Sequence, residues 1–168
     1  SYAGAAQQYN AGTGTLRLTG DVSLQGASGH ASSFFAQSGD IELLGVISGD
    51  AAHPVTFNSS SGRTIPLGTA NTFAATPTIS GAGKVEASLL SNAGVAGSLG
   101  TAAAVNISGG NLSYTGAGET SNKTWSINNG SLNNDGSGAL ALTGTVAISN
   151  TATLGGSYTG ADNVLAGV

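Results

Sequence analysis

The stretch Leu140-Ala141-Leu142-Thr143-Gly144-Thr145-Val146-Ala147-Ile148 decides the expected fold, because imperfect copies of it recur along the chain. Residues 16–24 repeat both its alternation and the position of its glycine, and residues 41–47 and 112–116 keep two apolar residues one apart, followed by glycine. Alternation with a period of two is typical of strands that bury one face. The repetition therefore predicts an all-β chain of similar short strands.

Two longer internal alignments extend this repetition. Residues 16–46 align with 140–168 after a two-residue gap, and residues 62–67 align with 122–127, so that a basic residue, Thr and two alternating apolar residues recur. The first alignment stops within a strand pattern, and the sequence contains no Met. We therefore expect residues 1–168 to be a single β-solenoid segment that belongs to a longer repetitive chain.

Composition limits how such a chain can build a core. The 168 residues include 28 Gly, 39% hydrophobic residues, 5% aromatic residues and only 7% charged residues. Small aliphatic side chains must supply the core, and equivalent strands stacked about 4.8 Å apart would align them in columns. Gly and Asn between strands suit the corners of such a coil, and Asn amides can form ladders along its axis. We predict a parallel β-solenoid, with a β-sandwich as the alternative that the strand spacing also permits.

Several segments carry more specific expectations. Residues 1–15 read as a loop or an incomplete repeat, and Phe34 and Phe35 lie in a predicted linker. Pro66 places its strand at an edge or a bend. Residues 88–104 are the one region where a short helix is plausible, although Gly94, Gly97 and Gly100 dilute its helix propensity. Predicted strands occupy residues 16–24, 40–48, 55–57, 64–67, 78–86, 105–107, 112–114, 124–127 and 139–148.

Three stretches in the second half resemble the autotransporter-associated β-strand repeat of bacterial passenger domains. They are Gly-Gly-Asn-Leu-Ser-Tyr-Thr-Gly at 109–116, Lys-Thr-Trp-Ser-Ile at 123–127 and Gly-Ser-Gly-Ala-Leu-Ala-Leu-Thr-Gly at 136–144. The family places Asn-x-Tyr-x-Gly soon after Thr-Gly, whereas here Asn150 and Tyr158 are spread apart. The resemblance implies a right-handed parallel β-helix that is secreted across the outer membrane and displayed or released as an adhesin or a structural stalk.

Candidate metal ligands and acids are few and scattered. His30 and His53 lie 23 residues apart in Gly- and Ala-rich segments, without a visible cluster of further ligands. Five aspartates lie beside Gly or Asn, where turn chemistry explains them and calcium is the alternative: Asp21, Asp40, Asp50, Asp135 and Asp162. Hydrolysis or lyase chemistry needs paired carboxylates, and none recur at repeat spacing. The sequence therefore predicts no catalytic residue, no cofactor and no metal site, and a protein that is not an enzyme.

Aromatic and amide residues offer alternative roles. Trp125 could be a platform for carbohydrate, but its alternation with Ile127 favours a place in the core. Tyr114 and Tyr158 are expected to be stacked positions of neighbouring repeats. Five Asn-x-Ser/Thr matches are expected to arise mostly by chance in so Asn-, Ser- and Thr-rich a chain: Asn58, Asn106, Asn111, Asn122 and Asn129.

Charge and hydrophobicity exclude some partners. The formal net charge is −4 with four basic residues, so no phosphate-binding footprint is present and nucleic acid is not an expected partner. No run approaches the roughly 20 apolar residues of a membrane span, so this segment is not expected to insert into a membrane. The expected partners are the chain itself, as neighbouring repeats or copies in a fibre, and cell-surface or matrix glycans.

Three functions remain open at this stage. The first is a non-enzymatic structural or adhesive segment of a secreted bacterial surface protein, with Thr-, Ser- and Asn-rich faces for weak multivalent contact. The second is a self-assembling extracellular filament or matrix subunit in which open ends or edge strands pair. The third is a β-helix that binds or processes carbohydrate.

Overall fold

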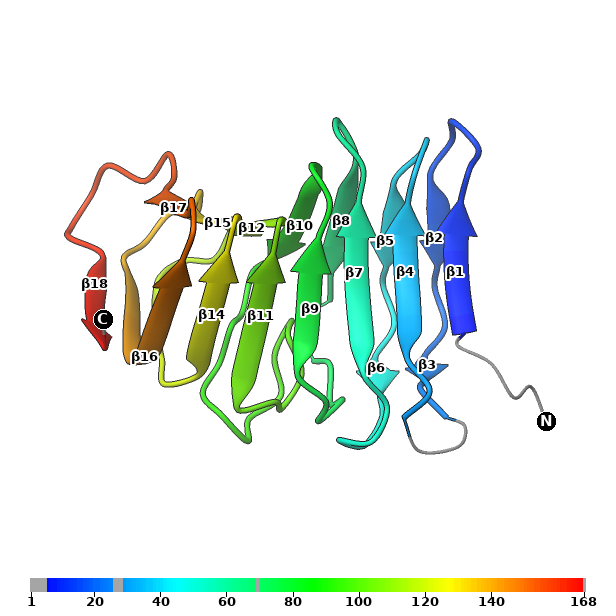
Figure 1. Cartoon of the computed structure of the whole chain (residues 1–168), viewed down its shortest axis with the longest axis horizontal. Helices are drawn as coiled ribbons and strands as arrows, with labels where there is room; N and C mark the ends of the chain where they lie inside the picture. The colour runs from blue at the N-terminus through cyan, green and yellow to red at the C-terminus, as the bar shows by residue number, and fades with distance from the viewer. Residues whose placement is uncertain (1–5, 26–28, 69, 168) are drawn as a thin grey trace.

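The computed structural model describes residues 6–25, 29–68 and 70–167, which form a β-solenoid of about seven turns (Figure 1). The ladders between its strands are parallel, for example β4 with β7 and β10 with β12. In Figure 1 the front strands point up and the rear strands point down while the chain advances from right to left, which is a right-handed coil. The predicted parallel β-helix is confirmed, and the antiparallel β-sandwich is excluded.

Each turn passes through two main sheets and a narrower third face. We call the front sheet of Figure 1 sheet A and the rear sheet sheet B. The strands of sheet A are β1 (Ala6–Asn10), β4 (Ser32–Ala36), β7 (Val55–Ser59), β9 (Pro77–Ser80), β11 (Ala104–Ser108), β14 (Thr124–Asn128) and the second half of β16 (Leu140–Ser149). Those of sheet B are β2 (Leu16–Leu18), β5 (Ile41–Leu43), β8 (Thr64–Leu67), β10 (Lys84–Ala87), β12 (Asn111–Tyr114), β15 (Ser131–Asn134) and β17 (Thr153–Gly155). The third face carries β3 (Val22–Ser23), β6 (Ile47–Ser48), β13 (Glu119–Ser121), the first half of β16 and β18 (Val164–Gly167).

The core consists of aliphatic and aromatic columns that run along the solenoid axis. One column of sheet A, set by the strand register, contains Phe34, Phe57, Ile79, Ile107 and Ile127. The facing column of sheet B contains Ile65, Val85, Leu112 and Leu132. These side chains are at most 4% exposed. Burying each one contributes roughly 1.5–3 kcal/mol, so the columns supply the stability that charged residues cannot.

Glycines occupy corners because successive turns approach too closely for a side chain. A Cβ atom added to Gly45 would lie 2.2 Å from the carbonyl oxygen of Gly20, one turn earlier. Gly136 stands in the same relation to Gly116, with a separation of 2.1 Å. In the motif Leu-x-Leu-Thr-Gly at 140–144, two inward apolar residues are followed by such a glycine, since a Cβ on Gly144 would lie 2.2 Å from the Lys123 carbonyl oxygen.

The length of a turn varies because the third face absorbs insertions. Register partners Ile79 and Ile107 are 28 residues apart, whereas Ile107 and Ile127 are 20 apart. The long turn contains residues 88–104, the one region where a short helix was plausible from the sequence. No helix forms there: the segment between β10 and β11 consists of turns, with Gly94 and Gly100 at positive φ, and it buries Leu90 and Leu99. Within the described residues no helix could span a membrane.

Two segments for which the sequence indicated no strand form strands of sheet A. Residues 6–10 form β1, which pairs with β4, and the predicted linker around Phe34 and Phe35 forms β4 itself. Pro66 lies in β8, between β5 and β10, and so is not on an edge strand. Between β5 and β8 the strand register contains one pair, Leu43 with Leu67, and Thr64 N–H donates to the Asp40 carboxylate at 2.9 Å instead. The solenoid thus accommodates proline where one ladder is incomplete.

The internal alignments of the sequence do not mark equivalent positions in the coil. Residues 64–67 lie in sheet B, whereas residues 124–127 lie in sheet A. Residues 16–18 belong to sheet B, whereas residues 140–142 belong to the third face. The same short pattern therefore suits any face of the solenoid, because each face needs inward apolar residues followed by a corner.

Candidate binding surfaces

The outer face of sheet A is a flat array of uncharged polar side chains. Strand register aligns Ser33, Thr56, Thr78, Asn106 and Ser126 in one outward column. A second outward column contains Tyr9, Phe35, Asn58, Ser80 and, further along, Asn128 and Ser149. None of the sheet A strands contains a charged residue. The charged strand residues lie in sheet B and on the third face: Arg17, Glu42, Lys84, Glu86 and Glu119.

The two sheets also differ in how their outward side chains are used. On sheet B, Asn111 Oδ1 accepts hydrogen bonds from Ser131 Oγ at 2.9 Å and Asn133 Nδ2 at 2.8 Å, and Arg17 pairs with Glu42 at 2.6 Å. On sheet A, among the described residues, two outward polar side chains are hydrogen-bonded: Asn128 accepts from Asn150 Nδ2 at 2.7 Å, and Thr124 Oγ1 donates to the Ala103 carbonyl oxygen at 3.3 Å. The other hydroxyls and amides of sheet A keep their donors and acceptors available.

A shallow depression of about 320 Å³ follows these columns across β9, β11 and β14. Its polar lining comprises Thr78, Asn106, Ser108, Ser126 and Asn128. Asn106, Ser108 and Ser126 are exposed. The array is therefore accessible over three consecutive strands.

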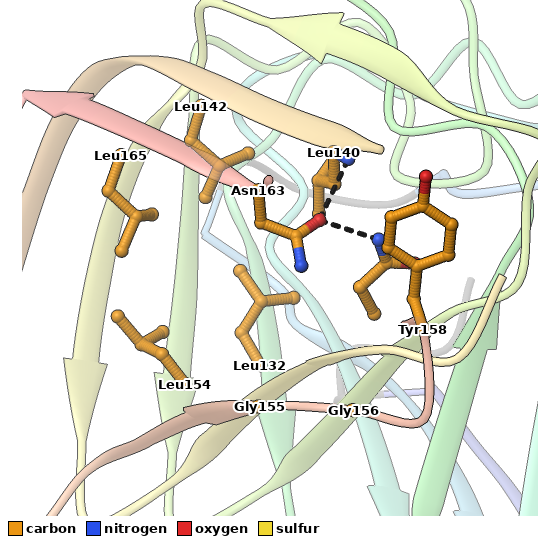
Figure 2. A pocket seen from close by; sticks show the side chains of 10 residues that line it. Leu132, Leu140, Leu142, Leu154, Gly155, Gly156, Tyr158, Asn163 and Leu165 are labelled. Atoms are coloured by element: carbon orange, nitrogen blue, oxygen red, sulfur yellow. Dashed lines mark hydrogen bonds between the residues drawn. The ribbon is translucent and has the colours of Figure 1, made fainter. Parts of the chain in front are cut away.

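The second surface is a pocket in the last described turn of the solenoid (Figure 2). A pocket of about 300 Å³ lies where the core columns stop, and it is lined by Leu132, Leu140, Leu142, Leu154 and Leu165, with Asn134, Tyr158 and Asn163 at its margin. Asn163 Oδ1 accepts hydrogen bonds from Leu140 N–H at 2.9 Å and Asn134 Nδ2 at 2.7 Å, and both appear as dashed lines in Figure 2. The pocket exposes core leucines rather than a set of reactive groups.

Trp125 lies in the core, as its alternation with Ile127 predicted. It is 2% exposed and pairs in register with Val105 and Val146, so it cannot be a surface platform. Tyr114 is buried, and its hydroxyl accepts a hydrogen bond from Gly118 N–H at 2.9 Å. Burial raises the pKa of this phenol.

The expectation that Tyr114 and Tyr158 belong to neighbouring repeats is wrong. Asn134 of β15 occupies the position next to Tyr114, and Tyr158 follows β17, one strand further on. Tyr158 OH accepts from Ala161 N–H at 2.9 Å, so each tyrosine instead closes its own Tyr-Thr-Gly loop.

The turn aspartates and corner asparagines connect successive turns of the coil. Asp21 accepts a hydrogen bond from Val46 N–H at 2.8 Å, and Asp135 accepts from Ser157 N–H at 2.9 Å and Ser113 Oγ at 2.6 Å. The Ser113 hydrogen bond, together with Ser157, lowers the pKa of Asp135 despite partial burial. The predicted asparagine ladder is present as Asn150 to Asn128 and Asn133 to Asn111. The two aspartates accept from backbone N–H groups of the next turn, whereas the asparagine pairs join the side chains of successive turns.

The five Asn-x-Ser/Thr asparagines fall into two groups. Asn58 and Asn106 face outward on sheet A. Asn111, Asn122 and Asn129 accept hydrogen bonds from the next or preceding turn, as in the 2.8 Å bond from Ala93 N–H to Asn122 Oδ1.

His53 contacts Asp50, Nδ1 to Oδ1 at 2.6 Å, and this hydrogen bond lowers the pKa of the Asp50 carboxyl. Within the described ranges there is no group of three or more His, Asp or Glu side chains that could hold a metal ion. The structure thus brings none of the scattered acids and histidines together as a ligand set.

Comparison with known proteins finds that the chain is similar to part of a bacterial adhesin. The chain is 42% identical over 159 residues to the adhesin BmaC autotransporter of Brucella suis biovar 1 (strain 1330). The match covers 89% of this chain but only 5% of that relative. No family model and no solved structure matches the chain. Together with the parallel solenoid, the match confirms the resemblance drawn from residues 109–144: the chain is a β-solenoid that is similar to a segment of an autotransporter adhesin.

Proposed function

We propose that the chain is a non-enzymatic adhesive segment of a secreted bacterial surface protein, and that it contacts its partners through the outer face of sheet A. The observation that carries this proposal is the contrast between the two sheets. Sheet B pairs many of its outward polar groups with one another, whereas on the described part of sheet A most outward hydroxyls and amides have no hydrogen-bond partner within the chain. The named adhesin relative supports the same class of role.

The array suits weak contacts that add up over several turns. A single hydrogen bond contributes roughly 0.5–1.5 kcal/mol net, so one Ser or Thr holds a partner poorly. Successive strands present equivalent groups about 4.8 Å apart, and a repetitive partner can engage many of them at once. Binding strength would then depend on the number of turns engaged rather than on one deep pocket.

The arrangement of the acids supports a role without catalysis. Glu42 pairs with Arg17, Glu86 pairs with Lys84 at 3.3 Å, and Asp135 bridges two turns. Acid–base chemistry on glycosides needs two carboxyl groups that face one substrate. These three carboxylates instead lie on different turns, and each one is paired with another group of the chain.

The test places a charge on each sheet in turn. In the variants Asn106→Lys and Ser126→Lys, an exposed ammonium would interrupt the neutral array, whereas Thr153→Lys adds the same charge at an exposed position of sheet B. Binding of the purified chain to cultured host cells and to immobilised extracellular matrix is measured by surface plasmon resonance and microscopy. We expect the sheet A variants to lose at least about tenfold in apparent affinity and Thr153→Lys to match wild type. Equal binding by all three variants would contradict the proposal.

Self-assembly is a second candidate, favoured by the leucine-lined end shown in Figure 2. Among the described residues β17 pairs only with β15 and β18 only with β16, so either a following segment of the same chain or another copy can pair with the other edge. A second copy whose β1 and β2 stack on this end would extend both sheets head to tail. Sedimentation velocity tests this: Leu165→Asp should abolish a concentration-dependent increase in size, and a wild-type chain that remains monomeric at high concentration excludes it.

A further inference from the structure

Sheet A carries one aromatic pair on its outer face. Tyr9 is 46% exposed, and Phe35 is half-buried beside it, with ring centroids 5.3 Å apart and planes inclined by 60°. The neighbouring residue Phe34 points inward and stacks on Phe57 in the core. Because side chains alternate along a strand, Phe35 must face away from the core. The pair is therefore an apolar platform set into an otherwise polar surface.

The column that contains the platform continues into hydrogen-bonding groups. Tyr9 pairs in register with Phe35, Phe35 with Asn58, and Asn58 with Ser80. Among the described residues neither Asn58 nor Ser80 uses its side chain in a hydrogen bond within the chain. A ligand lying along the solenoid axis would thus meet two aromatic rings, then an amide, then a hydroxyl.

This sequence of surfaces matches the chemistry of a sugar chain. A pyranose ring has an apolar face of C–H groups that packs on an aromatic ring, and hydroxyls at its edge that both donate and accept hydrogen bonds. Tyrosine supplies a rigid ring together with a polar group, so it suits contacts that are partly wet. The available amides and hydroxyls would satisfy the hydroxyls of successive rings.

The charge of sheet A and the cost of burying its polar groups favour a neutral glycan over an anionic glycan or a protein. The absence of Lys and Arg from the sheet A strands gives an anionic glycan no charge partner there. A protein partner with an apolar interface core would bury the hydroxyls and amides of sheet A without partners, at about 1–3 kcal/mol for each unsatisfied group. A neutral glycan avoids both costs.

We propose that Tyr9, Phe35 and Asn58 form a binding site for a neutral glycan chain that runs across the strands of sheet A. This inference rests on the proposed adhesive role of sheet A and names its ligand class. Tyr9 and Phe35 provide the stacking platform, and Asn58 and Ser80 bind the hydroxyls of the next ring.

The test uses defined oligosaccharides. Neutral hexasaccharides of glucose, xylose and N-acetylglucosamine, with a sulfated heparin hexasaccharide as the anionic counterpart, are titrated into the chain by isothermal calorimetry and saturation-transfer NMR. We expect at least one neutral hexasaccharide to bind and the sulfated one to bind at least about tenfold more weakly. Tyr9→Ala and Phe35→Ser should each weaken the neutral interaction by about tenfold or more, as for central aromatic contacts in other interfaces. Tyr9→Phe, which keeps the ring, should retain most of the affinity.

The control is Leu44→Ala, which removes a 58% exposed apolar side chain from the corner after β5. Each variant is first shown to have the wild-type circular dichroism spectrum and melting temperature, and Phe35→Ser gives a second route if Tyr9→Ala does not fold. Failure of every neutral hexasaccharide to bind, or unchanged binding by both aromatic variants, would overturn the glycan site. If Asn106→Lys still reduced attachment to cells in that case, the adhesive face would stand while its ligand class was wrong. Tyr9-dependent binding to a protein but to no glycan would also overturn the inference.

Discussion

Lys123 Nζ donates a hydrogen bond of 3.2 Å to the carbonyl oxygen of Gly100, and the side chain of Lys123 is completely buried. A second bond goes to the carbonyl of Ala102. Desolvation lowers the pKa of Lys123 to about 8, and the nearby Glu119 carboxylate opposes this shift. The lysine thus links the corner before β14 to the loop between β10 and β11, which lies one turn earlier.

This pKa makes stability depend on pH in a defined direction. The unfolded chain keeps the Lys123 proton up to about pH 10.5, whereas the folded chain releases it near pH 8, so the unfolded state binds more protons between these values. We predict that the free energy of unfolding from Lys123 rises by about 2 kcal/mol between pH 7 and pH 9.5. Urea denaturation at both pH values measures it. Lys123→Met should remove the increase, whereas Lys84→Met, at a partly exposed lysine, should keep it. If the free energy of unfolding changed equally with pH in wild type and in Lys123→Met, Lys123 would not be the source of the pH dependence.

The stacked corners predict a strong difference between two glycines at matching positions of consecutive turns. Gly45→Ala would place a Cβ 2.2 Å from the Gly20 carbonyl oxygen, whereas Gly20→Ala would meet nothing within 4 Å. We expect Gly45→Ala to destabilise the chain by at least about 2 kcal/mol, since the obstacle is backbone, and Gly20→Ala to change stability by less than about 1 kcal/mol. Thermal unfolding followed by circular dichroism decides this. Similar losses in both variants would show that close stacking is not the reason for the corner glycines.

Much of the solenoid is predictable because its core obeys a local rule. Two apolar residues one position apart, followed by Gly, predict a strand and a corner, and β2, β5, β12 and β16 confirm the strands. The strand β4 was missed because an apolar residue, Phe35, faces outward and a polar residue, Ser32, faces inward, so the apolar residues do not alternate in the sequence. β1 was missed for a similar reason, since Gln8 holds the position that Phe34 holds one turn later. These two strands place the aromatic pair on sheet A, so the same exceptions that obscured the fold also hid the candidate glycan site.

The assignment of strands to faces could not be predicted from the sequence. Leu16 and Leu140 begin nearly identical patterns, yet one lies in sheet B and the other on the third face. The face on which a strand lies depends on how many residues the preceding corners and loops contain. The long turn before β11 changes the number of residues between equivalent strands. The sequence also could not show which polar side chains form hydrogen bonds within the chain, because Asn106 and Asn111 are the same residue type five positions apart. Only the register shows that Asn111 is satisfied by its neighbours while Asn106 is exposed.

The column Ile107, Ile127 and Ile148 predicts how the cost of truncation falls toward the open end. Ile127 is fully buried between two isoleucines, whereas Ile148, its register partner in β16, is 45% exposed. Ile127→Ala should cost about 2–5 kcal/mol through lost burial and a cavity, and Ile148→Ala less than about 1.5 kcal/mol. Urea midpoints of the two variants give the comparison. If stacking of copies covers the end, the cost of Ile148→Ala will instead increase with protein concentration.

Glu119 controls the order of the loop between β10 and β11. Its carboxylate accepts hydrogen bonds from Leu90 N–H at 2.6 Å and Ser91 N–H at 2.9 Å, while Ser121 Oγ donates to the Ser91 carbonyl at 2.6 Å. Glu119→Ala would leave the two loop amides without their acceptors, at about 1–3 kcal/mol for each one that stays buried. We expect the loop to open locally before the solenoid unfolds, because the core columns of β9 and β11 do not depend on this carboxylate. Hydrogen exchange should therefore speed up at residues 90–98 and stay slow at Ile107.

Glu119→Gln, which retains one acceptor oxygen, should show an intermediate effect on exchange. It should also lower the pKa of Lys123 further, since it removes the opposing charge. Uniform acceleration of exchange along the chain would mean that Glu119 supports the whole coil rather than this loop.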